Sequence, residues 1–357
     1  MLHAVIMAGG SGTRFWPESR RKLPKQFLKF SSEQTLIQEA AGRCVPAIAD
    51  QNLWIVTNAL HAEESVRQLP SVRREQILLE PCGRNTAPCI GLAAIQILAV
   101  DPDAIMLVMP ADHVIKPASM FQQAVKQAVE HIERTPDSLV LFGVEPTYPA
   151  TGFGYIQRGE QIPDSGCPMF QVERFQEKPN QLAAARLVAS GEYYWNCGIF
   201  VWRASTILQT LAQYAPEIHE RLQRLQVAFG TADWEAALER EFSEMPSISI
   251  DYAVLEKASQ VCVLEAPFDW DDVGSWHALA RLTAAEGSNI LDGLICPVDS
   301  SGCIIRTSQD HLVATIGVKD LIIVHTPTAT LVADKRDEGA IKELIAELER
   351  RKLTDYL

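Results

Sequence analysis

A short apolar strand followed at once by a glycine-rich turn opens the chain, and this pair constrains the fold most. Residues 2–7 form an apolar run typical of a fully covered strand in a parallel sheet. The turn leaves the carboxyl end of that strand, where open α/β sheets bind ligands. Glycines tolerate positive φ and lack a Cβ, so consecutive backbone N–H groups can converge on phosphate oxygens. This phosphate-binding turn comprises Ala8, Gly9, Gly10, Ser11, Gly12, Thr13 and Arg14.

Positive charge is concentrated just after the turn. Residues 14–29 hold six cations (Arg14, Arg20, Arg21, Lys22, Lys25 and Lys29) against one acid, Glu18, in a chain whose net charge is −13. This local reversal of sign predicts a polyanionic ligand. Spacing excludes two familiar phosphate loops, because no Gly-Lys-Ser/Thr follows the glycines and Phe15 stands where a dinucleotide fingerprint needs a third glycine. The alternative is a tight strand-to-helix connection, which the added Arg14 and Lys25 make less favoured.

Composition bounds the class of protein. A length of 357 residues suffices for two domains, or for one large domain with an appendage. The eight cysteines lack paired two-residue spacing, so we expect neither zinc nor a disulfide framework, and we expect a reducing cytoplasm. The apolar runs are strand-sized and no signal sequence is evident, which argues against a membrane partner. A pI near 5.1 without a basic tail argues against nucleic acid.

The pattern of elements predicts a catalytic domain at residues 1–286 and a small C-terminal domain at 287–357. Apolar strands at 53–57, 76–79, 104–109 and 139–144 alternate with amphipathic helices, which indicates a mostly parallel sheet. Strands at 154–158 and 171–176 then indicate a mixed region, and a helix should run from Asn180 to Gly191. Residues 287–334 are β-rich. Residues 337–352 form an amphipathic helix, whose apolar stripe is Ile341, Leu344, Ile345 and Leu348.

Two acidic positions follow apolar runs and are candidate metal ligands. Asp112 comes directly after the strand at 104–109, and Asp272 follows the apolar run at 261–266. Mg²⁺ takes one or two protein carboxylates and completes its shell with water and substrate phosphate. The alternative for Asp112 is capping of a following helix.

Two further motifs place polar side chains beside apolar strands. Glu177 and Lys178 precede Pro179 at a strand end, where Lys178 would suit a phosphate and Glu177 a pair of sugar hydroxyls; the alternative is an exposed ion pair. Asn196 interrupts an apolar, aromatic strand and needs hydrogen-bond partners, which a sugar or neighbouring backbone could supply.

Together these motifs give the chain a specific resemblance. It resembles the nucleotidyltransferases that activate sugar 1-phosphates, in particular the mannose-1-phosphate guanylyltransferase (GDP-mannose pyrophosphorylase) family. The resemblance implies a Rossmann-like α/β nucleotidyltransferase domain with a mixed, mostly parallel central sheet, followed by a small, short β-helix-like domain and a terminal helix. Its motifs occur in the family's order at residues 8–14, 25–28, 80–88, 110–113, 152–156, 177–179, 196–200 and 249–253.

The resemblance also implies roles for individual residues. Lys25, Arg14 and Asp112 would be catalytic, and Asp112 and Asp272 would hold Mg²⁺. Gly152, Tyr155, Glu177, Lys178, Asn196 and Asp251 would bind the sugar phosphate. Cys197 and Gln176 stand where we expect serine and valine, and neither change removes an essential charge. The nucleotide would be bound by Ala8, Gly9, Gly10, Ser11, Gly12, Thr13, Arg14, Lys25, Glu80, Asn85, Thr86, Pro88 and Asp112.

The implied reaction transfers a guanylyl group from GTP to α-D-mannose 1-phosphate, giving GDP-mannose and pyrophosphate. Two alternatives stay open: a uridylyl- or thymidylyltransferase acting on glucose 1-phosphate, and a catalytically silent regulatory paralogue. The isomerase activity of longer family members is not expected. The stripe on the terminal helix predicts a homodimer, with docking of that helix on its own β domain as the alternative.

Overall fold

The computed structural model describes residues 1–10, 12–30, 32–163, 165–283 and 285–357, and the chain forms two compact units that interleave along the sequence. Unit 1 comprises residues 1–9, 40–111 and 115–270. Unit 2 comprises residues 10–39, 112–114 and 271–357. The phosphate-binding turn therefore starts in unit 1 and continues, from Gly10, in unit 2.

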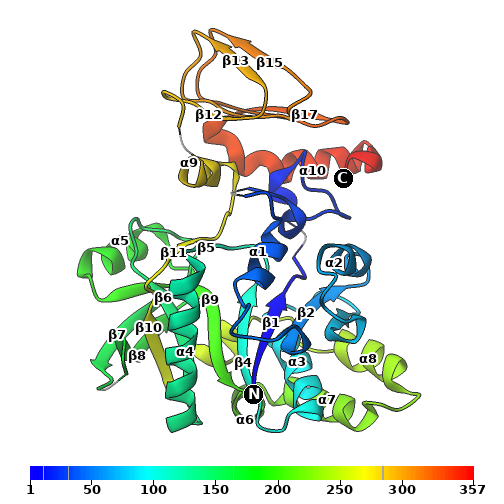
Figure 1. Ribbon diagram of the computed structural model, residues 1–357, viewed down its shortest axis with the longest axis vertical. Helices are drawn as coiled ribbons and strands as arrows, with labels where there is room; N and C mark the ends of the chain where they lie inside the picture. The colour runs from blue at the N-terminus through cyan, green and yellow to red at the C-terminus, as the bar shows by residue number, and fades with distance from the viewer. Residues whose placement is uncertain (11, 31, 164, 284) are drawn as a thin grey trace. The chain divides into compact units, whose positions relative to one another are not determined.

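Unit 1 is built on a nine-stranded sheet in the order β3-β2-β1-β4-β9-β6-β10-β8-β7 (Figure 1). All strands except β8 and β9 run in the same direction, so the sheet is mixed but mostly parallel, as predicted. β7 also pairs with β9, which closes the last five strands into a ring. The strands are β1 (Leu2–Met7), β2 (Leu53–Asn58), β3 (Ile77–Glu80), β4 (Ile105–Pro110), β6 (Leu139–Val144), β7 (Tyr155–Gln161), β8 (Met169–Gln176), β9 (Tyr193–Arg203) and β10 (Val261–Glu265).

Helices cover the strands β1, β2, β4 and β6 because these are apolar and buried almost throughout, whereas β7 and β8 also carry exposed polar residues. α3 packs with α6 and α7 in one core together with Val5 and Val108, while α4 lies against β4, β6 and β9. Gly91 lets α7 approach α3, since a Cβ there would lie 2.4 Å from Leu222 Cδ1. The helices are α1 (Leu36–Gly42), α2 (Ala62–Gln68), α3 (Thr86–Val100), α4 (Ala118–Arg134), α5 (Gln181–Ser190), α6 (Ala204–Tyr214), α7 (Pro216–Ala228) and α8 (Trp234–Ser243).

The local signals of α5 are confirmed in detail. The Asn180 side chain accepts a hydrogen bond from the Ala183 N–H at 2.9 Å, and Gly191 ends the helix with φ of 69°. Within the described residues, no helix has the length and apolarity that crossing a bilayer requires.

Unit 2 contains the β-rich C-terminal segment. β12, β14 and β16 pair in parallel in a sheet that ends with antiparallel β17, and β13 pairs in parallel with β15. Such repeated parallel rungs make the short β-helix that was predicted. The strands are β12 (Ile290–Asp292), β13 (Ile295–Val298), β14 (Ile304–Arg306), β15 (Val313–Ile316), β16 (Leu321–His325) and β17 (Thr330–Asp334), with the short strands β5 (Val114–Lys116) and β11 (Asp269–Asp271) where the chain passes between units.

The N-terminal segment 10–39 shares a core with the C-terminal strands. Phe15 and Phe30 pack edge-to-face with ring centroids 4.7 Å apart, and Phe15 packs against Trp276 at 5.0 Å. The terminal helix α10 (Ile341–Arg350) is shorter than predicted, because residues 335–340 form 3₁₀ turns instead. Its apolar stripe packs on the same core, and α9 (Leu279–Leu282) adds to it.

Candidate active site

The phosphate-binding turn is held at both ends. The Ala8 N–H donates to the Val56 carbonyl at 2.7 Å in unit 1, and the Gln26 side chain donates to the Gly10 carbonyl at 3.4 Å in unit 2. Ser11 lies outside the described residues. Thr13 and Arg14 belong to a 3₁₀ turn (Thr13–Phe15), in which Arg14 is exposed and has no ion pair recorded within the described part of the chain.

Gly12 and Lys25 are in direct contact. Gly12 has φ of 53°, and a Cβ at this position would lie 2.3 Å from the Lys25 backbone nitrogen. Any side chain would therefore be strained in conformation and would collide with backbone. Glycine at position 12 is required in order to place the turn against the predicted catalytic lysine.

Lys25 joins the two segments that carry the predicted metal ligands. It is 6% exposed and lies in a 3₁₀ turn (Lys25–Phe27). Its ammonium donates to Asp112 Oδ2 at 2.8 Å and to the carbonyl of Asp272. Burial would raise the pKa of Asp112, but the adjacent Lys25 and His113 outweigh it and hold that pKa below its usual value. Asp112 is thus an anion next to a buried cation.

The helix-capping alternative for Asp112 is wrong. The residue is followed by the strand β5 rather than by a helix, and its carboxylate is bound by Lys25. Asp272 lies beside strained backbone, since Val273 has φ of 45°, which is unfavourable for a β-branched residue. The Asp271 side chain stabilises this bend by accepting from the Val273 N–H at 2.7 Å.

The donors present fit a hard divalent cation in kind. Two carboxylates, those of Asp112 and Asp272, come from segments that Lys25 holds together, and oxygen ligands are what Mg²⁺ prefers. Two carboxylates leave most of the coordination shell to water and phosphate, as expected for a metal that arrives with its nucleotide. The described residues contain no cluster of three or more such ligands.

Glu80 and Gly9, two of the residues predicted to bind the nucleotide, lie close together in unit 1. A Cβ on Gly9 would lie 3.0 Å from Glu80 Oε2, so glycine keeps the turn close to this carboxyl. Glu80 is 7% exposed, and burial raises its pKa to about 7, against a smaller lowering by the Cys89 thiol. The carboxyl can therefore donate or accept a hydrogen bond near neutral pH.

The start of α3 joins two of the predicted motifs. Asn85 has φ of 67°, and its side chain caps the helix by accepting from the Thr86 N–H at 2.9 Å. The Thr86 hydroxyl accepts from the Ile250 N–H at 2.8 Å, which ties the 80–88 motif to the segment carrying Asp251. Pro88 is buried in the first turn of α3, so its contribution is to the helix start.

The predicted sugar-phosphate residues gather in unit 1. Asn196 Nδ2 donates to Asp251 Oδ1 at 2.9 Å, and Asn196 Oδ1 accepts from the Gly198 N–H. Lys178 donates to Glu177 Oε1 at 2.6 Å. Burial and the negative charge of Glu177 raise the pKa of Asp251 to about 6. These contacts make a pair of coupled carboxyls with a lysine and an amide around them.

Glu177 and Lys178 form the ion pair that the sequence offered as the alternative to substrate binding. The Glu177 side chain is only 7% exposed, while Lys178 is 56% exposed. Burial lowers the pKa of Lys178, yet its hydrogen bond with Glu177 outweighs this and the pKa is raised. Gly154 is needed here, since a Cβ would lie 2.5 Å from Glu177 Oε2.

Tyr155 has a different environment from the other predicted sugar ligands. Its side chain is fully buried, and its hydroxyl donates to the Ala150 carbonyl at 2.9 Å. The hydroxyl thus holds the loop that leads to Gly152, where a Cβ would meet nothing within 4 Å. A direct contact of the Tyr155 hydroxyl with a sugar is not what this geometry favours.

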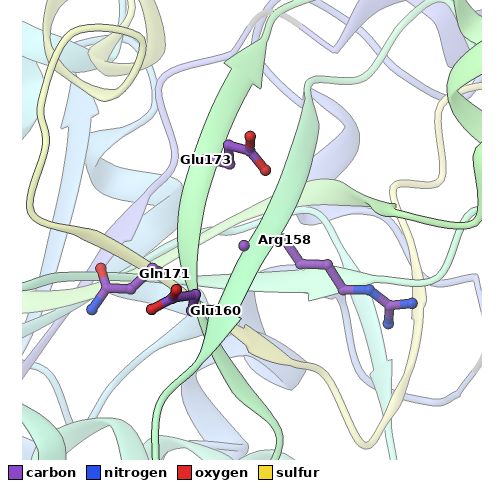
Figure 2. Close-up of a pocket in the computed structure, with 5 residues that line it drawn as sticks. Arg158, Glu160, Gln171 and Glu173 are labelled. Atoms are coloured by element: carbon purple, nitrogen blue, oxygen red, sulfur yellow. The ribbon is translucent and has the colours of Figure 1, made fainter.

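Of two surface pockets, one is lined by a predicted site residue and the other is not. One, of about 340 Å³, is lined by Glu80 and Pro81 together with Trp234 and Leu238 of α8. The other, of about 580 Å³, lies on β7 and β8 and is lined by Arg158, Gly159, Glu160, Gln171 and Glu173, none of which was predicted to bind substrate (Figure 2).

Sequence reasoning missed Gln26, which holds the turn, and Arg306, which contacts the segment around Lys25. Gln26 lay inside a family motif and could have been singled out. Arg306 carries no local signal.

Comparison with known proteins identifies the family of this chain. Residues 3–288 match the Nucleotidyl transferase family, and residues 294–348 match the MannoseP isomerase/GMP-like beta-helix domain. A mannose-1-phosphate guanylyltransferase of Escherichia coli is 40% identical over all of this chain and 76% of its own length. The alginate biosynthesis protein AlgA of Pseudomonas aeruginosa is 36% identical over 97% of this chain and 72% of its own length.

A solved structure gives the same answer. A crystal structure from Thermus thermophilus, described as a mannose-1-phosphate geranyltransferase, superposes with a TM-score of 0.87 at 31% identity, covering 98% of this chain and 99% of that one. The fold and family that the sequence motifs suggested are therefore confirmed. This chain belongs to the nucleotidyl transferase family and is similar along its whole length to mannose-1-phosphate guanylyltransferases.

Proposed function

We propose that this chain transfers the guanylyl group of GTP to α-D-mannose 1-phosphate, releasing GDP-mannose and pyrophosphate. The observation that carries this proposal is the position of Lys25, buried between the Asp112 carboxylate and the Asp272 carbonyl and packed on Gly12. Such a fixed cation beside a glycine turn suits a crowded phosphate group. The names of the similar proteins support the choice of base and sugar.

The mechanism needs positioning and charge neutralisation rather than a general base. A phosphate oxygen of mannose 1-phosphate is already ionised at neutral pH and attacks the α-phosphorus of GTP in line. The new O–P bond forms as the bond from the α-phosphorus to the bridging oxygen breaks, and that electron pair leaves with pyrophosphate. Lys25, Arg14 and the backbone N–H groups of the turn stabilise the negative charge on the phosphoryl oxygens.

We also propose that Mg²⁺ is the divalent cation that assists the transfer. Asp112 and Asp272 would hold it, and it would supply positive charge that stabilises the phosphate groups. Lys25 and His113 hold the pKa of Asp112 below its usual value, so the carboxylate is ionised and can ligate a cation.

The remaining site residues divide between nucleotide and sugar phosphate. Ala8–Arg14, Glu80, Asn85, Thr86 and Pro88 would form the nucleotide side, and Gly152, Glu177, Lys178, Asn196 and Asp251 the sugar-phosphate side. A buried carboxyl such as Glu80 suits the N–H groups at the edge of a guanine ring. Paired carboxyl and amide groups such as Asp251 and Asn196 suit vicinal hydroxyls.

We also propose residues 1–286 as the catalytic domain and 287–357 as the C-terminal β domain, which the ranges of the two matching families support. The eight thiols are free, five of them buried, which fits the reducing cytoplasm that we propose for this chain.

A homodimer remains part of the proposal, but on a different surface. The stripe on α10 does not argue for self-association, because it packs on the core of its own unit. An exposed apolar face exists instead on the paired strands β13 and β15. Val298 and Ile316 are opposite one another there and are 47% and 75% exposed. The same face of a second copy would cover it around a twofold axis.

One experiment tests the reaction directly. Pyrophosphate release is measured with each of GTP, ATP, UTP and dTTP against mannose 1-phosphate and glucose 1-phosphate, with Mg²⁺ and again with a chelator. We expect release with GTP and mannose 1-phosphate that the chelator abolishes. Preference for UTP or dTTP with glucose 1-phosphate would replace the proposal by its nearest alternative, and inactivity with every pair would favour the regulatory paralogue.

A further inference from the structure

Arg306, far from Lys25 in sequence, contacts the segment on both sides of that lysine. It lies at the end of β14 in unit 2, with its side chain 13% exposed. Its Nε donates to Glu18 Oε1 at 2.6 Å, and its Nη2 donates to the Lys29 carbonyl at 2.7 Å. Lys25 lies between these two contact points in the chain.

The guanidinium is itself fixed in place. Its Nη1 donates to Asp292 Oδ2 at 2.7 Å, from the neighbouring rung β12, and its carbon lies 5.4 Å from the centre of the Phe30 ring. All three guanidinium nitrogens are therefore engaged at once, in directions that a planar fork can satisfy and an ammonium cannot. A partly buried side chain with this many contacts is restrained in its orientation.

We infer that Arg306 is a positioning residue for the reaction, which holds the segment 18–29 so that Lys25 keeps its place between Asp112 and Asp272. This inference rests on the proposed function, since it assigns no new reaction. The β-helix thereby contributes to catalysis without touching substrate.

Removal of this contact should loosen Lys25 rather than unfold the unit. Phe15, Phe30 and Trp276 keep the segment in its core, and the Trp16 indole N–H still donates to the Tyr356 carbonyl at 2.7 Å. A misplacement of about 1 Å at a reacting group can lower turnover by about 10²-fold, whereas substrate contacts made elsewhere persist. The effect should therefore fall on kcat more than on KM.

The test compares Arg306→Met with Arg336→Met in the full chain, using the nucleotide and sugar phosphate on which the unaltered chain is most active. Arg336 is in the same unit, but it is 85% exposed and paired with Asp334. We expect kcat of Arg306→Met to fall by about 10- to 100-fold with KM changed by less than about threefold, and Arg336→Met to match the unaltered chain. Arg306→Lys should be intermediate, since it keeps the charge and loses the fork.

Hydrogen–deuterium exchange gives a readout that does not depend on turnover. Amides of residues 18–29 should exchange faster in Arg306→Met than in Arg336→Met. If exchange there and kcat are both unchanged, the inference is overturned. It is also overturned if kcat falls while exchange at 18–29 stays the same, because Arg306 would then act by another route.

A second variant covers the case in which Arg306→Met does not fold. Glu18→Gln removes the negative charge that accepts from Arg306 Nε in segment 18–29. The hydrogen bonds from Arg306 to the Lys29 carbonyl and to Asp292 stay in place. This variant should lower kcat in the same direction by a smaller factor, and the double variant should lose no more than Arg306→Met alone, because both act on one contact. Full kcat in Glu18→Gln would overturn the inference. If the unaltered chain is inactive with all substrate pairs, the proposed function fails, and the exchange comparison still decides whether Arg306 orders the segment.

Discussion

The two groups of charged residues around Lys25 and around Asp251 shift the pKa of a carboxyl group in opposite directions. Next to Lys25, Asp112 has its pKa held down, so charge is balanced and the carboxylate stays ionised. Around Asp251, burial and a neighbouring Glu177 raise the pKa of a carboxyl to about 6. The first group suits the phosphate and metal charge that we propose it binds. The second is short of positive charge, which suits a ligand that brings neutral hydroxyl donors.

The largest effect should come from removing the cation of the first group. Lys25→Met should lower kcat by about 10²- to 10³-fold, the range for loss of one preorganised stabilising donor. Steady-state kinetics with pyrophosphate detection measures this, and Lys126→Met, an exposed lysine of α4, is the control. Near-normal turnover would remove Lys25 from the mechanism. The group around Lys25 would then have no demonstrated catalytic role to compare with the group around Asp251.

A slightly smaller loss is expected when the backbone beside Lys25 is disturbed. Gly12→Ala forces a Cβ against the Lys25 nitrogen at a positive φ, so we expect about a 10²-fold loss of kcat/KM. Gly42→Ala is the matched control, because a Cβ there meets nothing within 4 Å. Equal activities of the two variants would show that the turn tolerates displacement.

A change in the second group should act on substrate affinity. Asn196→Ala removes the donor to Asp251 and leaves two carboxyls facing each other, so the KM for the sugar phosphate should rise about 10-fold. The KM for the nucleotide should stay as it is. Initial rates at varied sugar phosphate decide this, with Gln127→Ala, a surface hydrogen-bonding residue, as control. A rise confined to the KM for the nucleotide would show that our assignment of Asn196 to the sugar-phosphate site is wrong.

The smallest effect is expected on the pH dependence of folding stability, and it comes from the raised pKa of Asp251. Its pKa is about 6 in the folded chain against an ordinary value of 3.8, so the folded state holds the proton more tightly. Stability conferred at this site is therefore greatest below about pH 4 and declines as pH rises to about 6, by roughly 1–3 kcal/mol. Urea unfolding of the chain and of Asp251→Asn from pH 4 to 7 should show their difference changing over that window. A constant difference contradicts it.

Local signals in the sequence predicted much of the fold. The strand at residues 2–7 and the helix between Asn180 and Gly191 are where the sequence placed them, because a strand-length apolar run and helix capping are signals that act within a few residues. Asp112 also lies just after β4, as expected, since open sheets present such positions at their carboxyl edge, and its role as a metal ligand stays a prediction. The extent of the terminal helix was not predicted correctly, because residues 335–340 form 3₁₀ turns and Asp337 leaves the helical backbone angles.

The sequence by itself determined the family and the fold, and it predicted that a glycine turn, a nearby lysine and two distant acids serve one phosphate chemistry, because each residue type has only a few uses at such a place. Only the tertiary structure decided which of them touch. It put segment 10–39 with the C-terminal strands, joined Asn196 to Asp251, and set Arg306 on Glu18 across 288 positions of chain. Contacts between residues so far apart produce no repeating pattern in the amino-acid sequence, because they depend on how independently formed elements pack.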